Sequence, residues 1–456
     1  MNKNSKNLTL KVLLGYGSGD VGGNLYFTVV ALLLMNYFTD TIGLPSILAG
    51  IAVMLGKGWD AVTDPVVGFL SDKTRSRWGR RRPWLLFAAI PLGLSVFYLF
   101  KNPDINNKII LFLWASMSFI IVSTFYTFVN IPYNALTPEL TKDYDERTKL
   151  NGVRMFFAVC GTFLGGALSQ SIINTSANKT TGYMIMGAIY GGLMTLFAII
   201  PFITVKEPKI IETKINKENI FKSYISVFTN IPFILILIPW TLNIAGITVI
   251  TGSLIYYFKY LFNNEFLLTN AMLILLGFAM LFNIIITLLS KFIGRIGKKK
   301  IYFIGMSIFT FAVLIIFFFG HKFGLTFLFI FIGIAGIGFS THYVMPWSIV
   351  PDTIEYDYLK RKVKKEGVYY GLWTFLTKVG QAIAALLIGI ILKAFGYIPN
   401  VLQSERALFG IRLLIGPITA AFFIIANIIL VFYPINRKKY EEIQQQIKNM
   451  ELNSSK

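Results

Sequence analysis

Long apolar stretches recur along almost the whole chain, and this feature constrains the fold more than any other. Apolar residues make up 55% of the 456 residues, and Asp, Glu, Lys and Arg together make up only 14%. A helix of about 20 apolar residues is long enough to cross the hydrocarbon core of a bilayer. The stretches are too many and too long for the core of a soluble protein. The sequence therefore predicts an all-α protein that crosses a membrane many times.

Twelve transmembrane helices are predicted, six on each side of a polar connector. The first six are expected at about residues 12–39, 45–70, 83–100, 108–137, 153–174 and 181–204. The second six are expected at about residues 223–259, 267–290, 300–320, 323–349, 368–394 and 407–434. The expected domains are therefore an N-terminal six-helix bundle (1–204), a connector (205–221), a C-terminal six-helix bundle (222–435) and a polar tail (436–456).

The basic residues, which give the chain a net charge of +21, gather in short loops. Lys and Arg are concentrated at residues 71–82, 291–300, 360–365 and 437–439. Because basic loops stay on the cytoplasmic side, both termini and the connector are expected in the cytoplasm, with the protein in a bacterial inner membrane. No patch of interleaved basic and aromatic residues indicates a nucleic-acid partner. One cysteine and two separated histidines do not suffice for a Cys or His metal cluster.

The second predicted helix carries charged residues at the depth of the bilayer. At about 100° per residue, Lys57, Asp60 and Asp64 fall within a sector of about 60° and share one helix face. Each charge at that depth costs about 2.5 to more than 10 kcal/mol. Two acids spaced i, i+4 repel each other unless a cation or proton lies between them. The pattern predicts either a cation site on a transport path or a structural ion-pair network between helices.

Three sequence features recur in the same order in both halves of the chain, at offsets of 213 to 218 residues. They are Gly79-Arg80-Arg81-Arg82 with Gly297-Lys298-Lys299-Lys300, Pro138-Glu139 with Pro351-Asp352, and Gly152-Val153 with Gly367-Val368. A parallel duplication of six helices with a substrate site between the halves is similar to the major facilitator superfamily. The basic loops at 73–82 and 291–300 are expected either to latch onto acids such as Glu139 or to serve orientation alone.

Several motifs together resemble the glycoside–pentoside–hexuronide:cation symporters. The matching segments are residues 15–20, 59–65, 75–79, 130–133, 145–147 and 373–378. The resemblance extends from about residue 15 to 395, and its most specific part is the second helix with the adjoining basic loop. It implies a transporter that couples Na⁺, Li⁺ or H⁺ to the symport of a sugar, a glycoside or a hexuronate.

The resemblance also implies a cation site on the second helix. Asp60 and Asp64 are the expected carboxylate ligands of the metal ion, with Thr63 and Thr127 as neutral oxygen ligands. Hard cations prefer oxygen ligands, and two carboxylates offset a buried positive charge. The alternative for Thr127 is a hydrogen bond back to its own helix. The cation is expected as cargo, and no resident cofactor is expected.

A sugar site is implied by the same resemblance. Asp20 matches the family's acid on the first helix, and Arg154 matches its arginine on the fifth; the alternative for Arg154 is a gate or a side chain that extends to the cytoplasmic surface. Lys378 is the only charge in the middle of the eleventh helix and is expected to face the acids of the second helix. Its alternative is a structural bridge between the halves.

The sequence departs from the melibiose-carrying member of this family at two positions. Asn130 replaces an acid and Asn134 replaces a sugar-stacking tryptophan, so the specificity for galactosides is not implied. Asn130 still offers an acceptor and two donors to a polyol. Four aromatic residues are candidates for a stacking surface: Tyr126, Tyr133, Trp347 and Trp373. Packing or anchoring at the membrane interface is the alternative for each of them.

A transporter is therefore expected, and an enzyme is not. The chain lacks the nucleophile–base pair or metal cluster of an enzyme and the sizeable soluble domain of a sensor. A carrier of another cargo, such as a lysolipid or a drug, is the alternative on the same fold. The expected partners are a sugar or sugar acid, a monovalent cation and bilayer lipid, and the protein is expected to be a monomer.

Overall fold

The computed structural model describes residues 8–141, 144–207, 227–288, 296–362 and 366–454, and these residues form helices without any strand. They belong to two compact units. Unit 1 comprises Met1–Lys214, Leu254–Thr269 and Ala385–Leu408, and unit 2 comprises Ile215–Ser253, Asn270–Ala384 and Phe409–Lys456. Unit 1 thus includes two short segments from the second half of the sequence. The residue bounds of the two predicted bundles stay a prediction, and most of the connector lies outside the described residues.

Ten of the described helices are long and apolar enough to cross a membrane. The helix α3 (Ser46–Lys73) is not one of them, because the charges of Lys57, Asp60 and Asp64 lower its mean hydropathy. Its 28 residues nevertheless correspond to about 42 Å, enough for a crossing. The first predicted span is divided into shorter pieces: α1 (Leu10–Gly17), α2 (Gly19–Val29), η1 (Val30–Leu34) and η2 (Tyr37–Thr41). The number of twelve spans therefore stays a prediction.

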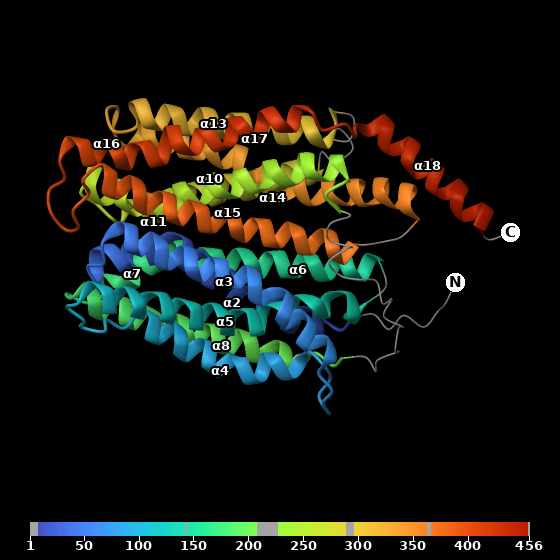
Figure 1. Cartoon of the computed structure of the whole chain (residues 1–456), viewed down its shortest axis with the longest axis horizontal. Helices are drawn as coiled ribbons and strands as arrows, with labels where there is room; N and C mark the ends of the chain where they lie inside the picture. The colour runs from blue at the N-terminus through green and yellow to red at the C-terminus, as the bar shows by residue number, and fades with distance from the viewer. Residues whose placement is uncertain (1–7, 142–143, 208–226, 289–295, 363–365, 455–456) are drawn as a thin grey trace. The chain divides into compact units, whose positions relative to one another are not determined.

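Unit 1 is built mainly from helices that run alongside one another (Figure 1). Besides α1 to α3, they are α4 (Arg82–Leu99), α5 (Lys108–Leu140), α6 (Tyr144–Phe163) with η3 (Leu164–Leu168) and α7 (Ser169–Ile173), and α8 (Lys179–Thr204). The helix α4 packs against α5 and α8, α3 packs against α5, and α2 packs against α6 and α8. These contacts bring the charged faces of α2, α3 and α6 into the interior of the unit.

Unit 2 contains most of the remaining helices. They are α10 (Ile231–Leu261), α11 (Leu267–Leu288), α13 (Lys298–Phe319), α14 (Gly324–Arg361), α15 (Glu366–Ala394), α16 (Glu405–Leu413) with η4 (Leu414–Ile418), α17 (Thr419–Val431) and α18 (Arg437–Ser454). The ends of α10 and α15 and the start of α16 belong to unit 1. Within unit 2, α13 packs against α14, η4 and α17, and the polar tail forms α18, which packs against α14.

Two helices differ from the predicted spans at their ends. The helix α14 continues to Arg361, twelve residues beyond the predicted end at 349, although it contains Pro346 and Pro351. The sequence prediction ended the span where the apolar stretch ends, but the amphipathic residues that follow continue the helix beyond it. The helix α10 begins at Ile231 instead of about residue 223, and residues up to 226 lie outside the described part of the chain.

The sequence repeat corresponds to a shared local structure at the start of two helices. Gly79 and Gly297 both have a positive φ, 106° and 95°; Gly79 lies three residues before α4, and Gly297 lies directly before α13. A side chain would be strained in this conformation, so glycine is required at both positions. In unit 1 the carboxylate of Glu207 also accepts the backbone N–H groups of residues 80–82, at 2.7, 2.8 and 2.7 Å. Glu207 thereby satisfies donors that the first turn of α4 would leave unpaired.

The basic residue after each of these glycines binds an acid near the end of a neighbouring helix. Arg80 Nη2 and Arg81 Nε both donate to Glu139 Oε1, at 2.6 and 2.7 Å. In unit 2, Lys298 Nζ donates to the carboxylate of Asp352, at 2.7 and 2.8 Å. The expected contact with Glu139 is thus present, and the corresponding acid of the repeat makes the corresponding contact.

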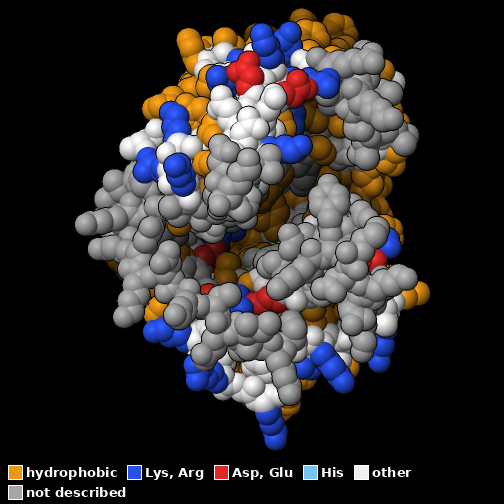
Figure 2. Space-filling model, turned by 90° about the vertical axis from the view of Figure 1, so that its right-hand side faces the viewer, with side chains coloured by type: hydrophobic (Ala, Val, Ile, Leu, Met, Phe, Trp, Pro, Cys, Tyr) orange, Lys and Arg blue, Asp and Glu red, His pale blue; other side chains and the backbone are white. Residues whose placement is uncertain are grey.

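Basic side chains lie at the surface beside the loop between α3 and α4. Figure 2 shows a face on which Lys and Arg side chains lie at the surface together with several acidic ones. In the loop between α3 and α4, Arg75 and Arg77 are exposed, whereas Arg81 is buried and pairs with Glu139 and with the exposed Asp72. This distribution agrees with the expectation from loop charge, and the orientation of the protein in the membrane stays a prediction.

Candidate functional site

Asp20 lies in the first turn of α2, at a point where glycine allows a close approach between helices. A Cβ atom on Gly19 would lie 2.5 Å from the ring of Tyr133 on α5, so a larger residue would force the two helices apart. The Tyr133 hydroxyl donates to Asp20 Oδ2 at 2.7 Å. The carboxyl group is 9% exposed and lies inside unit 1. The glycine-rich segment therefore serves to place an acid among the helices.

Arg154 on α6 forms a two-pronged ion pair with Asp20. Its Nε donates to Asp20 Oδ2 at 2.6 Å, and its Nη2 donates to Oδ1 at 3.1 Å. The remaining donors reach Thr137 Oγ1 at 2.8 Å and Asn134 Oδ1 at 2.6 Å, both on α5. The guanidinium also lies 5.1 Å from the centre of the Tyr133 ring. Arg154 thus lies within unit 1, and its guanidinium is paired with Asp20.

Asn130 and Tyr126 extend this polar set along α5. The Asn134 amide donates to Asn130 Oδ1 at 2.9 Å, so a continuous chain of hydrogen bonds runs from Asp20 through Arg154 to Asn130. A cavity of about 20 Å³, room for about one water, is lined by Tyr126, Asn130 and other residues of unit 1. Four of the predicted sugar-site residues therefore lie along adjoining helices of one unit.

The two acids of α3 lie one helical turn apart, as predicted. Asp60 is 1% exposed, and Thr127 Oγ1 on α5 donates to Asp64 Oδ1 at 3.0 Å. Thr127 therefore bonds to the acid of a neighbouring helix. Thr63 instead donates back to its own helix, to the carbonyl oxygen of Trp59 at 3.0 Å, and its oxygen keeps lone pairs for a cation. Of the four predicted cation ligands, Thr127 and Asp64 are thus joined by a hydrogen bond, and Asp60 and Thr63 lie on the same helix as Asp64.

Aromatic side chains connect the cation set to the sugar set. Lys57, one turn before Asp60, is buried, and its Nζ lies 5.7 Å from the centre of the Tyr26 ring. Tyr26 in turn stacks on Tyr126, with ring centres 4.0 Å apart. Tyr126 and Asn130 both line the small cavity, so the ring contacts that start at α3 lead to the cavity beside the chain of hydrogen bonds.

Two predicted site residues, Trp373 and Lys378, lie on α15 in unit 2. Trp373 stacks on Trp240 with ring centres 4.7 Å apart, and its indole N–H has no hydrogen-bond partner among the described residues. Its surroundings fit the packing alternative. Trp347, with its ring centre 6.1 Å from that of Trp373, is 47% exposed and offers the accessible aromatic surface. That Lys378 faces the acids of α3 stays a prediction.

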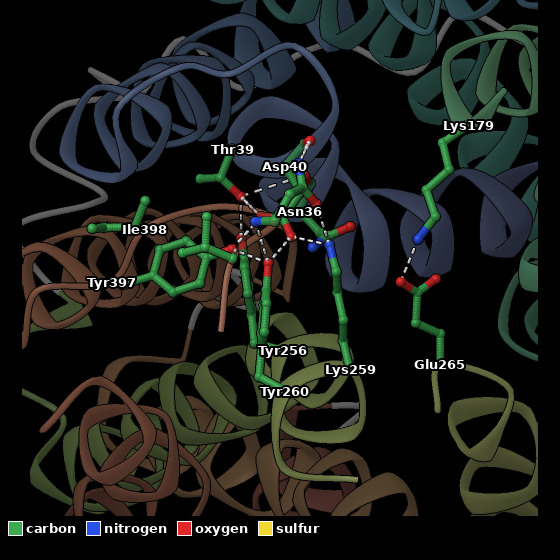
Figure 3. A network of polar contacts seen from close by, with 12 residues as sticks. Asn36, Thr39, Asp40, Lys179, Tyr256, Lys259, Tyr260, Glu265, Tyr397 and Ile398 are labelled. Carbon is green, nitrogen blue, oxygen red and sulfur yellow. Dashed lines mark hydrogen bonds and ion pairs between the residues drawn. The ribbon is translucent and has the colours of Figure 1, made fainter. Parts of the chain in front are cut away.

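A second buried polar cluster, shown in Figure 3, was not identified from the sequence. It surrounds Asp40 of η2, whose side chain is 3% exposed. The Tyr260 hydroxyl donates to Asp40 Oδ2 at 2.5 Å, and Lys259 and Tyr397 also donate to this carboxylate. Asn400 accepts a further bond from Lys259 at 2.7 Å. The sequence offered only a weak signal for this cluster: one acid, Asp40, and one lysine, Lys259, each at the end of an apolar stretch.

Tyr397 in this cluster remains a hydrogen-bond donor over a wide pH range. Burial and the nearby Asp40 carboxylate raise the pKa of Tyr397 above its usual value, because both disfavour the phenolate. The hydroxyl therefore keeps its proton at neutral pH.

Buried charges, paired acids on one helix and an ordered polar network across α2, α5 and α6 lie among helices that have the major facilitator fold. The chain belongs to the MFS/sugar transport protein family, whose sequence profile matches residues 15–437. Its resemblance to the glycoside–pentoside–hexuronide:cation symporters is confirmed by this match and by the relatives.

Relatives and solved structures both cover nearly the whole chain. A glucuronide carrier protein homolog of Escherichia coli is 30% identical over 98% of this chain and 97% of the relative. A Salmonella typhimurium protein, named as a proposed sulfoquinovose importer, is 32% identical over 96% of this chain and 94% of the relative. Among solved structures, a D-xylose-proton symporter matches with a TM-score of 0.66 and 15% identity. The match covers 94% of this chain and 98% of the symporter. This structural likeness shows the fold alone.

Proposed function

We propose that the protein is a secondary active transporter that couples Na⁺, Li⁺ or H⁺ to the symport of a sugar, a glycoside or a hexuronate by alternating access. The observation that carries this proposal is the Asp20–Arg154 pair and its continuation to Asn130. A carboxylate accepts hydrogen bonds from neighbouring sugar hydroxyls, and a guanidinium and an amide donate to sugar oxygens. Charged groups inside a membrane protein are costly and are typical of transport paths.

Asp60 and Asp64, with the Thr127 and Thr63 hydroxyls, are proposed as the cation site. Two carboxylates and two hydroxyls suit a hard monovalent cation or a proton. The cation is cargo in this proposal, and neither a resident cofactor nor a covalent reaction is involved.

The proposed coupling follows from charge. A bound cation compensates the two acids of α3 and lowers the cost of keeping them buried. The contacts from Lys57 through Tyr26 to Tyr126 provide a route by which this change reaches the sugar set. Cation and sugar together then favour the conformational change that exposes the site to the other side of a bacterial inner membrane. The protein is proposed to work as a monomer.

A carrier of another cargo, such as a lysolipid or a drug, is the second candidate on this fold. The names of the two relatives, a glucuronide carrier homolog and a proposed sulfoquinovose importer, favour a sugar acid instead. Such a substrate carries hydroxyl groups for Asp20 and an anionic group for a basic side chain.

Uptake into membrane vesicles tests the proposal. Labelled glycosides, pentosides and hexuronates are offered with a Na⁺ gradient or a pH gradient imposed separately. We expect accumulation of at least one sugar that requires one of the two gradients. Accumulation of a lysolipid or a drug without any sugar uptake would favour the second candidate. Equal uptake with and without gradients would contradict cation coupling.

A further inference from the structure

Gly23 lies on the side of α2 that faces α5, beside the proposed sugar set. It follows Asp20 by three residues, so both residues lie on the same side of the helix, about 4.5 Å apart along its axis. Gly23, Tyr126 and Asn130 all line the cavity of about 20 Å³. Each of these three residues is half-buried, so their surroundings are partly accessible.

Packing between the helices does not require a glycine at this position. A Cβ atom on Gly19 would lie 2.5 Å from the Tyr133 ring, whereas a Cβ atom on Gly23 would lie 3.8 Å from its nearest neighbours, an ordinary van der Waals distance. Those neighbours are Asn130 Oδ1 and the Tyr126 hydroxyl oxygen. Glycine inside a helix is less stable than alanine. The feature that Gly23 provides is therefore the open space between α2 and these two polar atoms.

The two polar atoms beside this space have unused hydrogen-bonding capacity. Asn130 Oδ1 accepts one bond, from the Asn134 amide at 2.9 Å, and its second lone pair is open. The Tyr126 hydroxyl donates to no residue in the part of the chain that the structure describes. Its ring stacks on Tyr26 with ring centres 4.0 Å apart, which fixes the position of the hydroxyl. A donor and an acceptor are thus held in place before a substrate binds.

A hydroxyl group fits this space in size and in bonding. The cavity has room for about one water, and a hydroxyl group is of similar size. A hydroxyl can accept from Tyr126 and donate to Asn130 Oδ1, whereas a carboxylate cannot donate and a methyl group can do neither. A buried donor or acceptor that a ligand leaves unpaired weakens binding.

We propose that Gly23 is a specificity-determining residue of the sugar site, because the space beside it receives one hydroxyl group of the substrate. This inference rests on the proposed function. The hydroxyl accepts from Tyr126 and donates to Asn130, and a second hydroxyl of the same sugar binds Asp20 one helical turn away. An epimer that directs its hydroxyl elsewhere leaves both polar atoms unpaired, so the site reads the configuration at one carbon.

Equilibrium binding to the purified full chain tests this inference. A panel of glycosides, pentosides and hexuronates identifies the sugar that the parent binds most tightly, and a set of analogues then lacks one hydroxyl each. Gly23→Ala places a methyl group in the space at ordinary contact distance from Tyr126 and Asn130. We expect this variant to bind the complete sugar about tenfold to a hundredfold more weakly than the parent does.

One analogue should be insensitive to this substitution. The analogue that lacks the hydroxyl at Gly23 should bind to Gly23→Ala as tightly as it binds to the parent, because the methyl group occupies space that this analogue leaves empty. The losses from the substitution and from the missing hydroxyl are then not additive, as expected for two groups at one place. Tyr126→Phe keeps the ring and should reduce the preference for the complete sugar over this same analogue.

Gly192→Ala is the matched control. Gly192 lies inside α8 of the same unit, and a Cβ atom there would meet nothing within 4 Å. Its substitution should leave the affinity for every sugar unchanged. Both alanine variants should melt at or above the temperature of the parent, since alanine favours the helix.

Two results would overturn this inference alone. If Gly23→Ala binds the complete sugar as the parent does, the cavity holds a structural water and no part of the substrate. If Gly23→Ala weakens the complete sugar and all analogues equally, the methyl group acts on the packing of α2 against α5. A parent that binds no sugar of the panel would overturn the proposed function, and this inference with it.

Discussion

Removal of the Thr127 hydroxyl tests whether this residue is a ligand of the coupling cation. Thr127→Val removes the donor to Asp64 and one oxygen from the proposed cation set. We expect the apparent affinity for the coupling cation to fall about fivefold to tenfold, since such a hydrogen bond contributes about 1 to 1.5 kcal/mol. The measurement is the cation concentration that half-maximally raises the melting temperature.

Thr124→Val is the matched control for this change. Thr124 lies three residues earlier on α5, and its oxygen accepts from Trp59 and donates to the carbonyl of Ile120. Loss of the Thr124 hydroxyl should leave the dependence of the melting temperature on cation concentration unchanged. Equal effects of both substitutions would show that Thr127 has no special relation to the cation.

Asp20 is expected to separate sugar recognition from cation binding. Asp20→Asn keeps an acceptor oxygen but removes charge-assisted hydrogen bonds, worth about 1.5 to 3 kcal/mol each. Sugar affinity should fall about tenfold to more than a hundredfold, and the shift of melting temperature with cation should persist. Asp104→Asn changes an exposed acid and serves as the control. Loss of cation binding with intact sugar binding would place Asp20 in the cation site instead.

At the scale of residues, the sequence predicted which charged residues are candidates for function. It did not predict equally well which residues each of them contacts. Burial cost alone marks Asp20 and Arg154 as charges in apolar stretches, and it marks Asp60 as part of the charged face that it shares with Lys57 and Asp64. The pairing of Arg154 with Asp20 depends on how α2 and α6 approach each other across 134 positions of sequence. No local pattern encodes such a distance, so the role of Asn134 as the link to Asn130 also required the structure.

At the scale of elements, the basic loops and their acids were predictable because each repeat carries the same short motif. The Asp40 cluster was not, because its members come from η2, the end of α10 and the segment after α15. Each of these elements contributes one or two ordinary polar residues. The first span was predicted as one helix, since hydropathy does not reveal the π-helical segments η1 and η2 that divide it.

The Asp40 cluster is expected to stabilise the packing of these elements. Lys259→Met leaves a buried carboxylate without its ammonium partner, a loss of about 3 to 5 kcal/mol for a buried pair. The melting temperature should fall clearly, and adding Asp40→Asn should restore part of it. Lys179→Met is the control, because the Lys179 side chain is 48% exposed in its pair with Glu265, and such pairs contribute about 0 to 1 kcal/mol. A larger fall in melting temperature for Lys179→Met than for Lys259→Met would contradict the prediction that the buried pair contributes more than the exposed one.

At the scale of the whole molecule, Lys378 tests whether the second half of the chain contributes a charge to the site. Lys378→Leu should impair transport if the amine compensates the acids of α3, because the loss of one partner leaves a buried charge uncompensated. Lys393→Leu changes an exposed lysine later on the same helix and should transport normally. Normal uptake by the Lys378 variant would mean that this lysine serves neither the site nor the coupling.

Coupling itself is a property of the whole molecule, and the acids of α3 provide its test. Asp60→Asn or Asp64→Asn removes one negative charge from a set that compensates a desolvated cation. We expect each variant to lose accumulation driven by a gradient. Exchange of labelled for unlabelled sugar should continue, because the set around Asp20 and Arg154 remains intact. Uptake into vesicles with and without a gradient measures the first property, and exchange at equal concentrations measures the second. Accumulation at the level of the parent in both variants would refute a cation site on this helix.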